Sequence, residues 1–137
     1  MPLVVSSRAV ELISNSKNPK QDIIKAVGDL SGVKVKFNYV LMATYIRPSK
    51  TAGGIIRPDS NVAEDEWQGK VGLVLKLGSM AYQDDEDTQF NGERVEVGEW
   101  AVFHVGDAKS LNIRGYPCRY IRDSSIRMTV DDPNIVF

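Results

Sequence analysis

The spacing of hydrophobic residues changes from a helical to a strand period near residue 33. Before that point, one helical face carries Ile23, Ile24, Val27 and Leu30. Asn18-Pro19 is a favourable helix start and Gly32 a favourable end, so the pattern predicts an amphipathic helix between them. A shorter helical piece is expected at residues 8–13. The apolar face is expected to pack on the chain's own domain, with docking on a partner as the alternative.

From residue 33 onward, apolar and polar residues alternate with the period of two that is typical of β-strands. In the longest run, residues 33–46, the second half is apolar at both parities, so it is expected in a sheet covered on both faces. Residues 69–77 alternate again, and one side is expected to carry Val71, Leu73, Leu75 and Leu77. Shorter runs follow at residues 95–105, 111–113, 116–121 and 126–130. This spacing predicts an all-β domain, a small β-barrel or sandwich, behind an N-terminal and mostly helical extension.

Two long breaks interrupt the strand pattern. The first, residues 47–68, has neither a helix nor a strand period, and Pro48, Pro58 and Gly53-Gly54 are typical of a solvated loop. Its two large apolar residues, Ile55 and Ile56, have no nearby reason to be buried. Because a loop of this length inside a domain is usually functional, we expect a mobile binding arm anchored by the two isoleucines.

The second break, residues 78–92, carries four consecutive acidic residues: Asp84, Asp85, Glu86 and Asp87. Asn91-Gly92 is a tight-turn signal, so we expect a hairpin excursion with the acidic run at its tip. An EF-hand calcium loop needs acidic ligands at alternate positions and a central glycine, and this run provides neither. A solvated loop tip is the favoured interpretation, and no metal site is expected.

Composition narrows the class of protein without naming a function. At 137 residues, with 42% hydrophobic and 26% charged residues, the chain fits one soluble globular domain. A net charge of -1 provides no global basic field for nucleic acid. The single cysteine excludes an internal disulfide, and no apolar run reaches the ~20 residues of a membrane helix. The N-terminus lacks a signal-peptide pattern, so a cytoplasmic location is expected.

Residues that could support catalysis are few and isolated. His104 is the only histidine and Cys118 the only cysteine, and each is expected to be structural within its apolar strand pattern. One of each cannot assemble a zinc site. Trp67 and Trp100 are most simply core or interface aromatics. A small hydrolase using His104 with Cys118 or a serine is the minor alternative; the expectation is a protein that is not an enzyme.

The order of these features resembles the GroES-type co-chaperonins, the chaperonin-10 family. The resemblance begins at the strand YVLMATYI and extends to Phe137. Its most specific part is a Ser-Lys-Thr-Ala-Gly-Gly-Ile-Ile loop followed by the strand GKVGLVLKLG. Three later stretches are similar to family strands in the same order: VEVGEWAVFHVGD, RYIRDSSIRMTVDD and IVF.

The resemblance implies a small GroES-like β-barrel that assembles into a heptameric ring and caps a GroEL-type chaperonin. The chaperonin binds ATP, so the protein itself is expected to need no cofactor, and the closed chamber encloses a client protein. Chaperonin binding is then expected at Gly53, Gly54, Ile55, Ile56 and Arg57. Arg57 departs from the family, which usually has a third apolar residue there.

The same resemblance divides the chain into an N-terminal extension, residues 1–36, and a barrel domain, residues 37–137. Within the barrel it implies a mobile loop at 47–68 and a roof hairpin at 79–93 with the acidic run as its loop. The expected subunit interface comprises Tyr39, Leu41, Ile135, Val136 and Phe137. From the apolar tail alone, pairing with its own sheet and with the next subunit are equally favoured.

The N-terminal extension and the atypical roof sequence depart from cellular family members and resemble co-chaperonins encoded by tailed bacteriophages. Such a protein would act in the host cytoplasm, helping a client such as the major capsid protein to fold inside the host chaperonin. The alternative from another class is a virion structural β-barrel whose arm and N-terminal helix clamp neighbouring capsid subunits. No nucleic-acid or membrane partner is expected.

Overall fold

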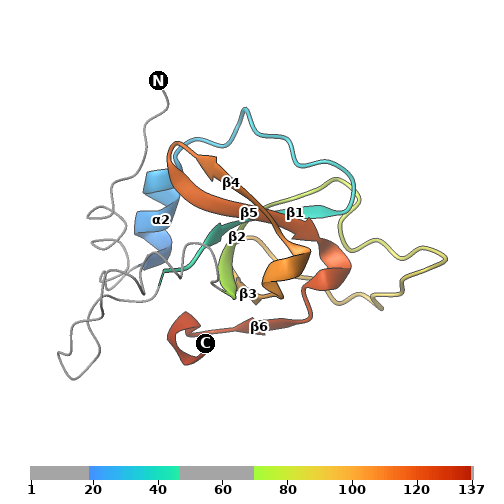
Figure 1. Cartoon of the computed structure of the whole chain (residues 1–137). Helices are drawn as coiled ribbons and strands as arrows, with labels where there is room; N and C mark the ends of the chain where they lie inside the picture. The colour runs from blue at the N-terminus through green and yellow to red at the C-terminus, as the bar shows by residue number, and fades with distance from the viewer. Residues whose placement is uncertain (1–18, 47–69, 137) are drawn as a thin grey trace.

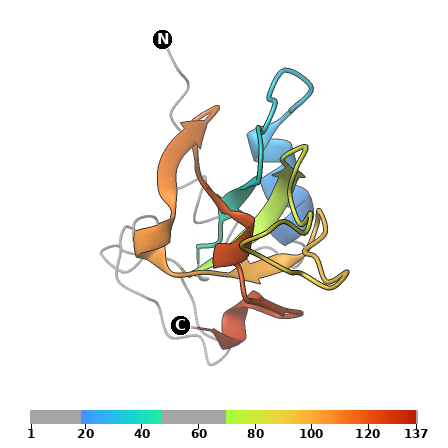
Figure 2. The same ribbon diagram turned by 90° about the vertical axis from the view of Figure 1, so that its right-hand side faces the viewer.

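The computed structural model describes residues 19–46 and 70–136, and these residues are organised around one six-stranded antiparallel sheet (Figure 1). The strand order is β4-β5-β1-β2-β3-β6, which leaves β4 and β6 at the two edges of the described sheet. The sheet is strongly curved, with β4 and the C-terminal segment at opposite ends of the view in Figure 2. The prediction of a β-rich domain is confirmed.

The elements are α2 (Pro19–Val27), β1 (Tyr39–Thr44), β2 (Val71–Leu77), β3 (Trp100–Val102), η1 (Val105–Asp107), β4 (Lys109–Ile113), β5 (Tyr116–Arg122), η2 (Asp123–Ser125), β6 (Met128–Val130) and η3 (Pro133–Ile135).

Helix α2 forms where the sequence predicts a helix, but it is shorter. It ends at Val27 because Gly28 adopts a φ of 79°, the left-handed conformation that terminates helices, and the Gly28 amide donates to Ile24 O at 3.0 Å. The predicted end at Gly32 is therefore wrong. Ile23 and Val27 are fully buried against the sheet, which confirms packing on the chain's own domain. No helix in the described ranges is both long and apolar enough to cross a membrane.

The sheet has an apolar core on each face, as the sequence of β1 predicts. The helix-side core combines α2 with Leu41 and Ala43 of β1, and the opposite core contains their neighbours Val40 and Met42. Adjacent strand residues point to opposite faces, so alternate residues enter different cores. Other strand residues of the helix-side core are Val71, Leu73, Leu75, Trp100, Tyr116 and Cys118. The opposite core also includes Val74, Val95, Ala101, Phe103, Ile121 and Ile126.

The predicted long strand at residues 33–46 is interrupted at its beginning. Regular pairing starts only at Tyr39, because Phe37 adopts a φ of 54° and the Tyr39 amide closes a turn onto Lys36 O at 3.3 Å. Gly78 packs against this turn, and its amide donates to Tyr39 O at 2.8 Å. The segment before β1 is thus a turn fitted against the end of β2.

A β-bulge in β2 changes which residues share a face. The partner of Leu41 is Lys76 and the partner of Met42 is Val74, so one residue of β2, Leu75, is inserted between the paired positions. Beyond this bulge, Leu77 packs against the opposite core. The prediction that Leu77 shares a side with the other β2 leucines is wrong, because the bulge shifts the alternation of faces beyond Leu75.

Residues 79–93 leave the sheet and return, but no strand forms within them. Two turns shape this excursion: the Asp85 amide donates to Thr88 O, and the Glu93 amide donates to Phe90 O across Asn91-Gly92. Asn91 and Gly92 both have positive φ, as a tight type I′ turn requires. Tyr82 and Phe90 pack edge to face at 5.1 Å and hold the two limbs together. The turn prediction is confirmed, and the two limbs of the predicted hairpin excursion are joined by side-chain contacts without strand pairing.

The later strands also deviate in length from the prediction. Gly98, with a φ of 94°, restricts the run predicted at 95–105 to β3. β4 and β5 form a hairpin across Arg114 and Gly115, both at positive φ. The Arg114 guanidinium donates to Val27 O at 2.7 Å, so this turn also caps the C-terminal end of α2.

Candidate functional site

The predicted binding arm is attached to the adjacent ends of two directly paired strands. The Tyr45 amide donates to Val71 O at 2.9 Å, and the Phe103 amide donates to Lys70 O at 2.9 Å. Tyr45 and Ile46 are both buried, so the chain is fixed in place up to the residue before the arm. Residues 47–69 lie outside the described residues, and with them Trp67 and the predicted binding residues Gly53, Gly54, Ile55, Ile56 and Arg57.

Side chains around Tyr45 make this attachment point rigid. Tyr45 and Trp100 pack edge to face at 5.1 Å in the helix-side core. The Tyr45 hydroxyl donates to Asn134 Oδ1 at 2.6 Å, and the Tyr116 hydroxyl donates to Thr44 O at 3.0 Å. Two adjacent antiparallel strands can be joined by a loop of only about 2–5 residues. Residues 47–69 therefore form an insertion on a fixed base rather than a connection that the fold requires.

The apolar tail is partly attached to its own chain. Val136 packs against the helix-side core, and Asn134 of η3 is bonded to Tyr45. Ile135 is 72% exposed, whereas Phe137 lies outside the described residues. Of the two options for the tail, the described residues show contact with its own domain through a 3-10 turn and leave one large apolar side chain exposed.

The other two predicted interface residues differ from each other in exposure. Tyr39 is half-buried and packs edge to face against Tyr120 at 5.7 Å. Leu41 is 3% exposed in the helix-side core, and its strand is paired on both sides, with β2 and with β5. Leu41 therefore has no free surface for a second subunit, and we leave it out of the proposed interface.

The acidic run lies on an exposed loop whose shape it helps to fix. Asp85 Oδ1 accepts hydrogen bonds from the Asp87 and Thr88 amides at 2.8 and 2.7 Å, and Asp84 Oδ1 accepts one from the Phe90 amide at 2.6 Å. All four acidic side chains are exposed. Within the described residues, no three side chains of the metal-binding types come together. The run is a solvated tip stabilised by its own turns.

The two residues considered for catalysis occupy very different environments. Cys118 is buried in the helix-side core, and burial raises the pKa of its thiol to about 12. A thiol held in its neutral form is a poor nucleophile. His104 is exposed after β3, where its Nδ1 accepts from the Gly106 amide at 3.1 Å and caps η1, so the expected strand position is wrong. The environment of Cys118 therefore argues against a role for this thiol as a nucleophile.

Two buried charged residues carry structural roles that sequence patterns did not reveal. Asp123 is 3% exposed; its Oδ2 accepts from the Tyr82 amide at 2.9 Å and thereby fixes the root of the 79–93 excursion. Arg119 is almost fully buried, and its guanidinium lies 5.5 Å from the Phe103 ring centroid. Burial lowers the pKa of Arg119 and raises that of Tyr82, where the Asp123 charge adds to the effect. The sequence around Asp123 and Arg119 has no motif that predicts the burial of these two charged residues.

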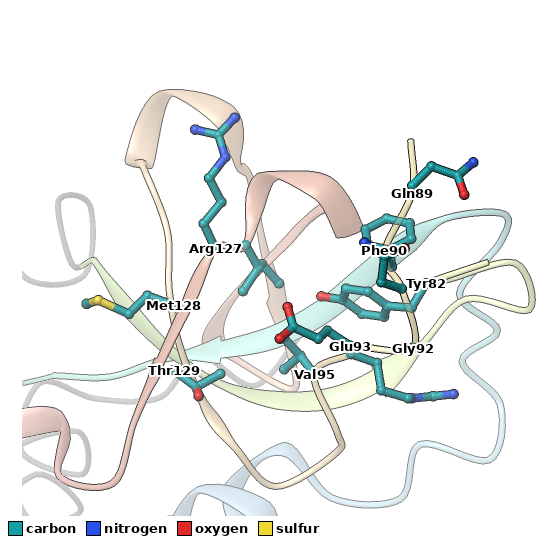
Figure 3. A pocket seen from close by; sticks show the side chains of 12 residues that line it. Tyr82, Gln89, Phe90, Gly92, Glu93, Val95, Arg127, Met128 and Thr129 are labelled. Carbon is teal, nitrogen blue, oxygen red and sulfur yellow. The ribbon is translucent and has the colours of Figure 1, made fainter. Parts of the chain in front are cut away.

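An open pocket of about 700 Å³ lies between this excursion and β6. Figure 3 shows Tyr82 and Phe90 on one side of it and Arg127, Met128 and Thr129 on the other. Val95, from the opposite core, also lines it. This pocket has no signature in the sequence, because its two walls are more than thirty residues apart in the chain.

No protein-family model matches the chain, and no curated protein matches it. Function is therefore argued from the residues and their geometry.

Proposed function

We propose that the protein is a co-chaperonin that caps a GroEL-type chaperonin and closes the chamber in which a client folds. The observation that carries this proposal is the placement of residues 47–69 between the adjacent, fixed ends of β1 and β2. This insertion carries Gly53-Gly54-Ile55-Ile56, two large apolar residues after a pair of glycines. An apolar anchor on an arm with a rigid base suits docking into a groove on another protein.

The affinity follows from linking several weak arms. An arm that becomes ordered on binding loses conformational entropy, so each single contact is weak. When several arms belong to one ring, later contacts become intramolecular and the combined affinity rises steeply. Weak individual arms also allow the lid to leave when the nucleotide state of the chaperonin changes. On the resemblance to GroES-type co-chaperonins, the proposal includes a heptameric ring of GroES-like barrels, with ATP bound by the chaperonin.

The ring interface is proposed at Tyr39, Ile135, Val136 and Phe137. Of these, Ile135 is exposed and Tyr39 half-buried, so both have surface available to a neighbouring subunit. We further propose that the protein is encoded by a phage, acts in the host cytoplasm and serves a capsid-protein client. In this proposal α2 supports the domain, because Ile23 and Val27 are used within its own core.

The experiment replaces both anchors at once. Ile55→Ser with Ile56→Ser removes two isoleucine contacts, at least about 3 kcal/mol per arm, and linked arms multiply the loss. We expect the variant to remain assembled but to lose co-sedimentation with a GroEL-type chaperonin in ATP. Val97→Ser is the matched control, because Val97 is an exposed apolar residue outside the arm. Unchanged binding of the double variant would contradict the proposal, and recovery of the protein in purified virus particles would favour the virion alternative.

A further inference from the structure

One end of the sheet exposes aromatic and basic side chains on the face that elsewhere packs against α2. Pairing places Tyr39 opposite Arg122 and Tyr120 opposite Lys109, and directly opposed residues share a face. Following the same face along β5 leads from Cys118, in the helix-side core, to Tyr120 and Arg122. We call Tyr39, Lys109, Tyr120 and Arg122 the basic face. It continues the apolar face of the sheet beyond the area that α2 covers.

The basic face is accessible and its charges are available. Lys109, Tyr120 and Arg122 are exposed, and Tyr39 and Tyr120 contact each other edge to face. Asp123, which directly follows β5, is buried and directs its carboxylate to the Tyr82 and Ser124 amides. A third cation on this face, Lys76, is already bonded to Leu30 O and Val33 O at 2.7 Å each. Tyrosine and arginine together are typical of the core of protein interfaces.

The chain also carries a surface of opposite charge that fits this face. The acidic tip, Asp84–Asp87, projects from the body of the domain (Figure 1), and all four side chains are exposed. Asp84 and Asp85 shape the loop through backbone amides, so its form is defined before any partner binds. The net charge of the protein is only -1, so positive and negative side chains nearly balance over the whole chain. The acidic tip and the basic face are local concentrations of opposite charge.

The two surfaces lie at the same end of the domain. The excursion begins beside Tyr39, where the Gly78 amide donates to Tyr39 O, and Asp123 at the end of β5 bonds the Tyr82 amide. A contact of tip on face is heterologous, and repeating it from copy to copy closes a ring when the rotation between neighbours closes.

We propose that the acidic tip of one copy docks on the basic face of the neighbouring copy. This inference rests on the proposed function for its ring, and it adds a second, charge-based contact to the apolar interface at the tail. Lys109 and Arg122 pair with the acidic side chains, and the two tyrosines provide contact area. Neutralising the acidic tips in this way also prevents their mutual repulsion around the ring. Because the contact is ionic and exposed, salt weakens it.

The test reverses the charge of the basic face and neutralises that of the acidic tip, first separately and then together. The face variant carries Lys109→Glu and Arg122→Glu, and the tip variant carries Glu86→Lys and Asp87→Lys, which spares the two loop-shaping aspartates. Each variant is expected to raise the concentration of half-assembly about tenfold or more by native mass measurement and sedimentation. The four-substitution protein, in which the two new lysines of the tip can pair with the two new glutamates of the face, is expected to recover assembly. Lys25→Glu with Lys34→Glu is the control, with the same change in net charge on exposed lysines elsewhere.

The outcomes separate this inference from the proposed function. Normal assembly of the face variant, or no recovery in the four-substitution protein, overturns the docking of tip on face. If wild-type rings still cap the chaperonin in that case, the co-chaperonin proposal stands and only this inference fails. A labelled oligo-dT strand tests nucleic acid as an alternative partner of the basic face. If the wild-type protein binds the strand tightly and the face variant does not, while assembly is unchanged, the basic face binds nucleic acid and the inference is overturned.

Discussion

At the scale of single residues, the fold depends on a few positions where backbone segments meet closely. Gly78 is the clearest, because a Cβ added there would lie 2.2 Å from Phe37 O and 2.9 Å from Lys36 O and Tyr39 O. Phe37, at a φ of 54°, is also bonded to this segment, since the Met80 amide donates to Phe37 O at 2.9 Å. The absence of a side chain at residue 78 thus allows the turn before β1 to pack on the end of β2.

Gly78→Ala is expected to lower the free energy of unfolding by about 2 kcal/mol or more, because backbone atoms must move apart. Chemical denaturation measures this directly. Gly32→Ala is the matched control, since nothing lies within 4 Å of the added Cβ, and it is expected to change stability by less than about 1 kcal/mol. Equal effects of the two substitutions would show that the close contact is not the cause.

The buried thiol of Cys118 gives a prediction on pH. Its pKa rises from an ordinary 9.0 to about 12 in the folded protein, so folding favours the neutral form. This contribution to stability is complete below pH 9 and decreases as the pH rises towards 12. Relative to Cys118→Ala, the wild-type protein should lose about 2 kcal/mol of unfolding free energy between pH 8 and 10.5. A parallel pH dependence of the two proteins would contradict the burial of the thiol.

At the scale of elements, two basic side chains connect the C-terminal end of α2 to the sheet, one from β2 and one from the turn between β4 and β5. Arg114 bonds Val27 O, and Lys76 bonds two carbonyls of the segment that follows the helix. Positive charge at a helix C-terminus also interacts favourably with the helix dipole. The helix is therefore an integral layer of the domain.

Arg114→Ala is expected to lower the free energy of unfolding by about 1–2 kcal/mol, since it removes a charge-assisted bond to a helix carbonyl. Hydrogen exchange should show the loss first at the amides of α2. Arg94→Ala removes an arginine of an exposed ion pair, 2.9 Å from Glu96, and is expected to cost less than about 0.5 kcal/mol. A similar cost for both variants would exclude a specific role for the bond to the helix.

Elements were easier to predict than their ends and registers. The strand-like spacing of apolar residues located β1, β2 and β5. In β1, apolar residues at both parities also predicted that the two faces of the sheet are covered. It missed the bulge at Leu75 and the left-handed turn at Phe37, since both depend on contacts with distant segments. The basic face was missed for the same reason: its residues come from three strands, and only their pairing brings them together.

At the scale of the whole molecule, the co-chaperonin proposal assigns the base to the described sheet and the chemistry of recognition to residues 47–69. The ends of β1 and β2 are fixed by main-chain bonds and by buried aromatic side chains. The candidate anchors Ile55 and Ile56 could be recognised from the sequence because apolar residues in a solvated segment have no structural explanation. Residues 47–69 lie outside the described residues, so the sequence predicts the chemistry of the proposed anchors and not their geometry.

The most direct test of the co-chaperonin proposal is the native mass of a GroEL-type chaperonin mixed with the wild-type protein and ATP. The proposal predicts a discrete species that exceeds the chaperonin by the mass of seven chains, and its loss with Ile55→Ser and Ile56→Ser. A chaperonin whose mass stays unchanged in excess of the correctly folded protein would contradict it.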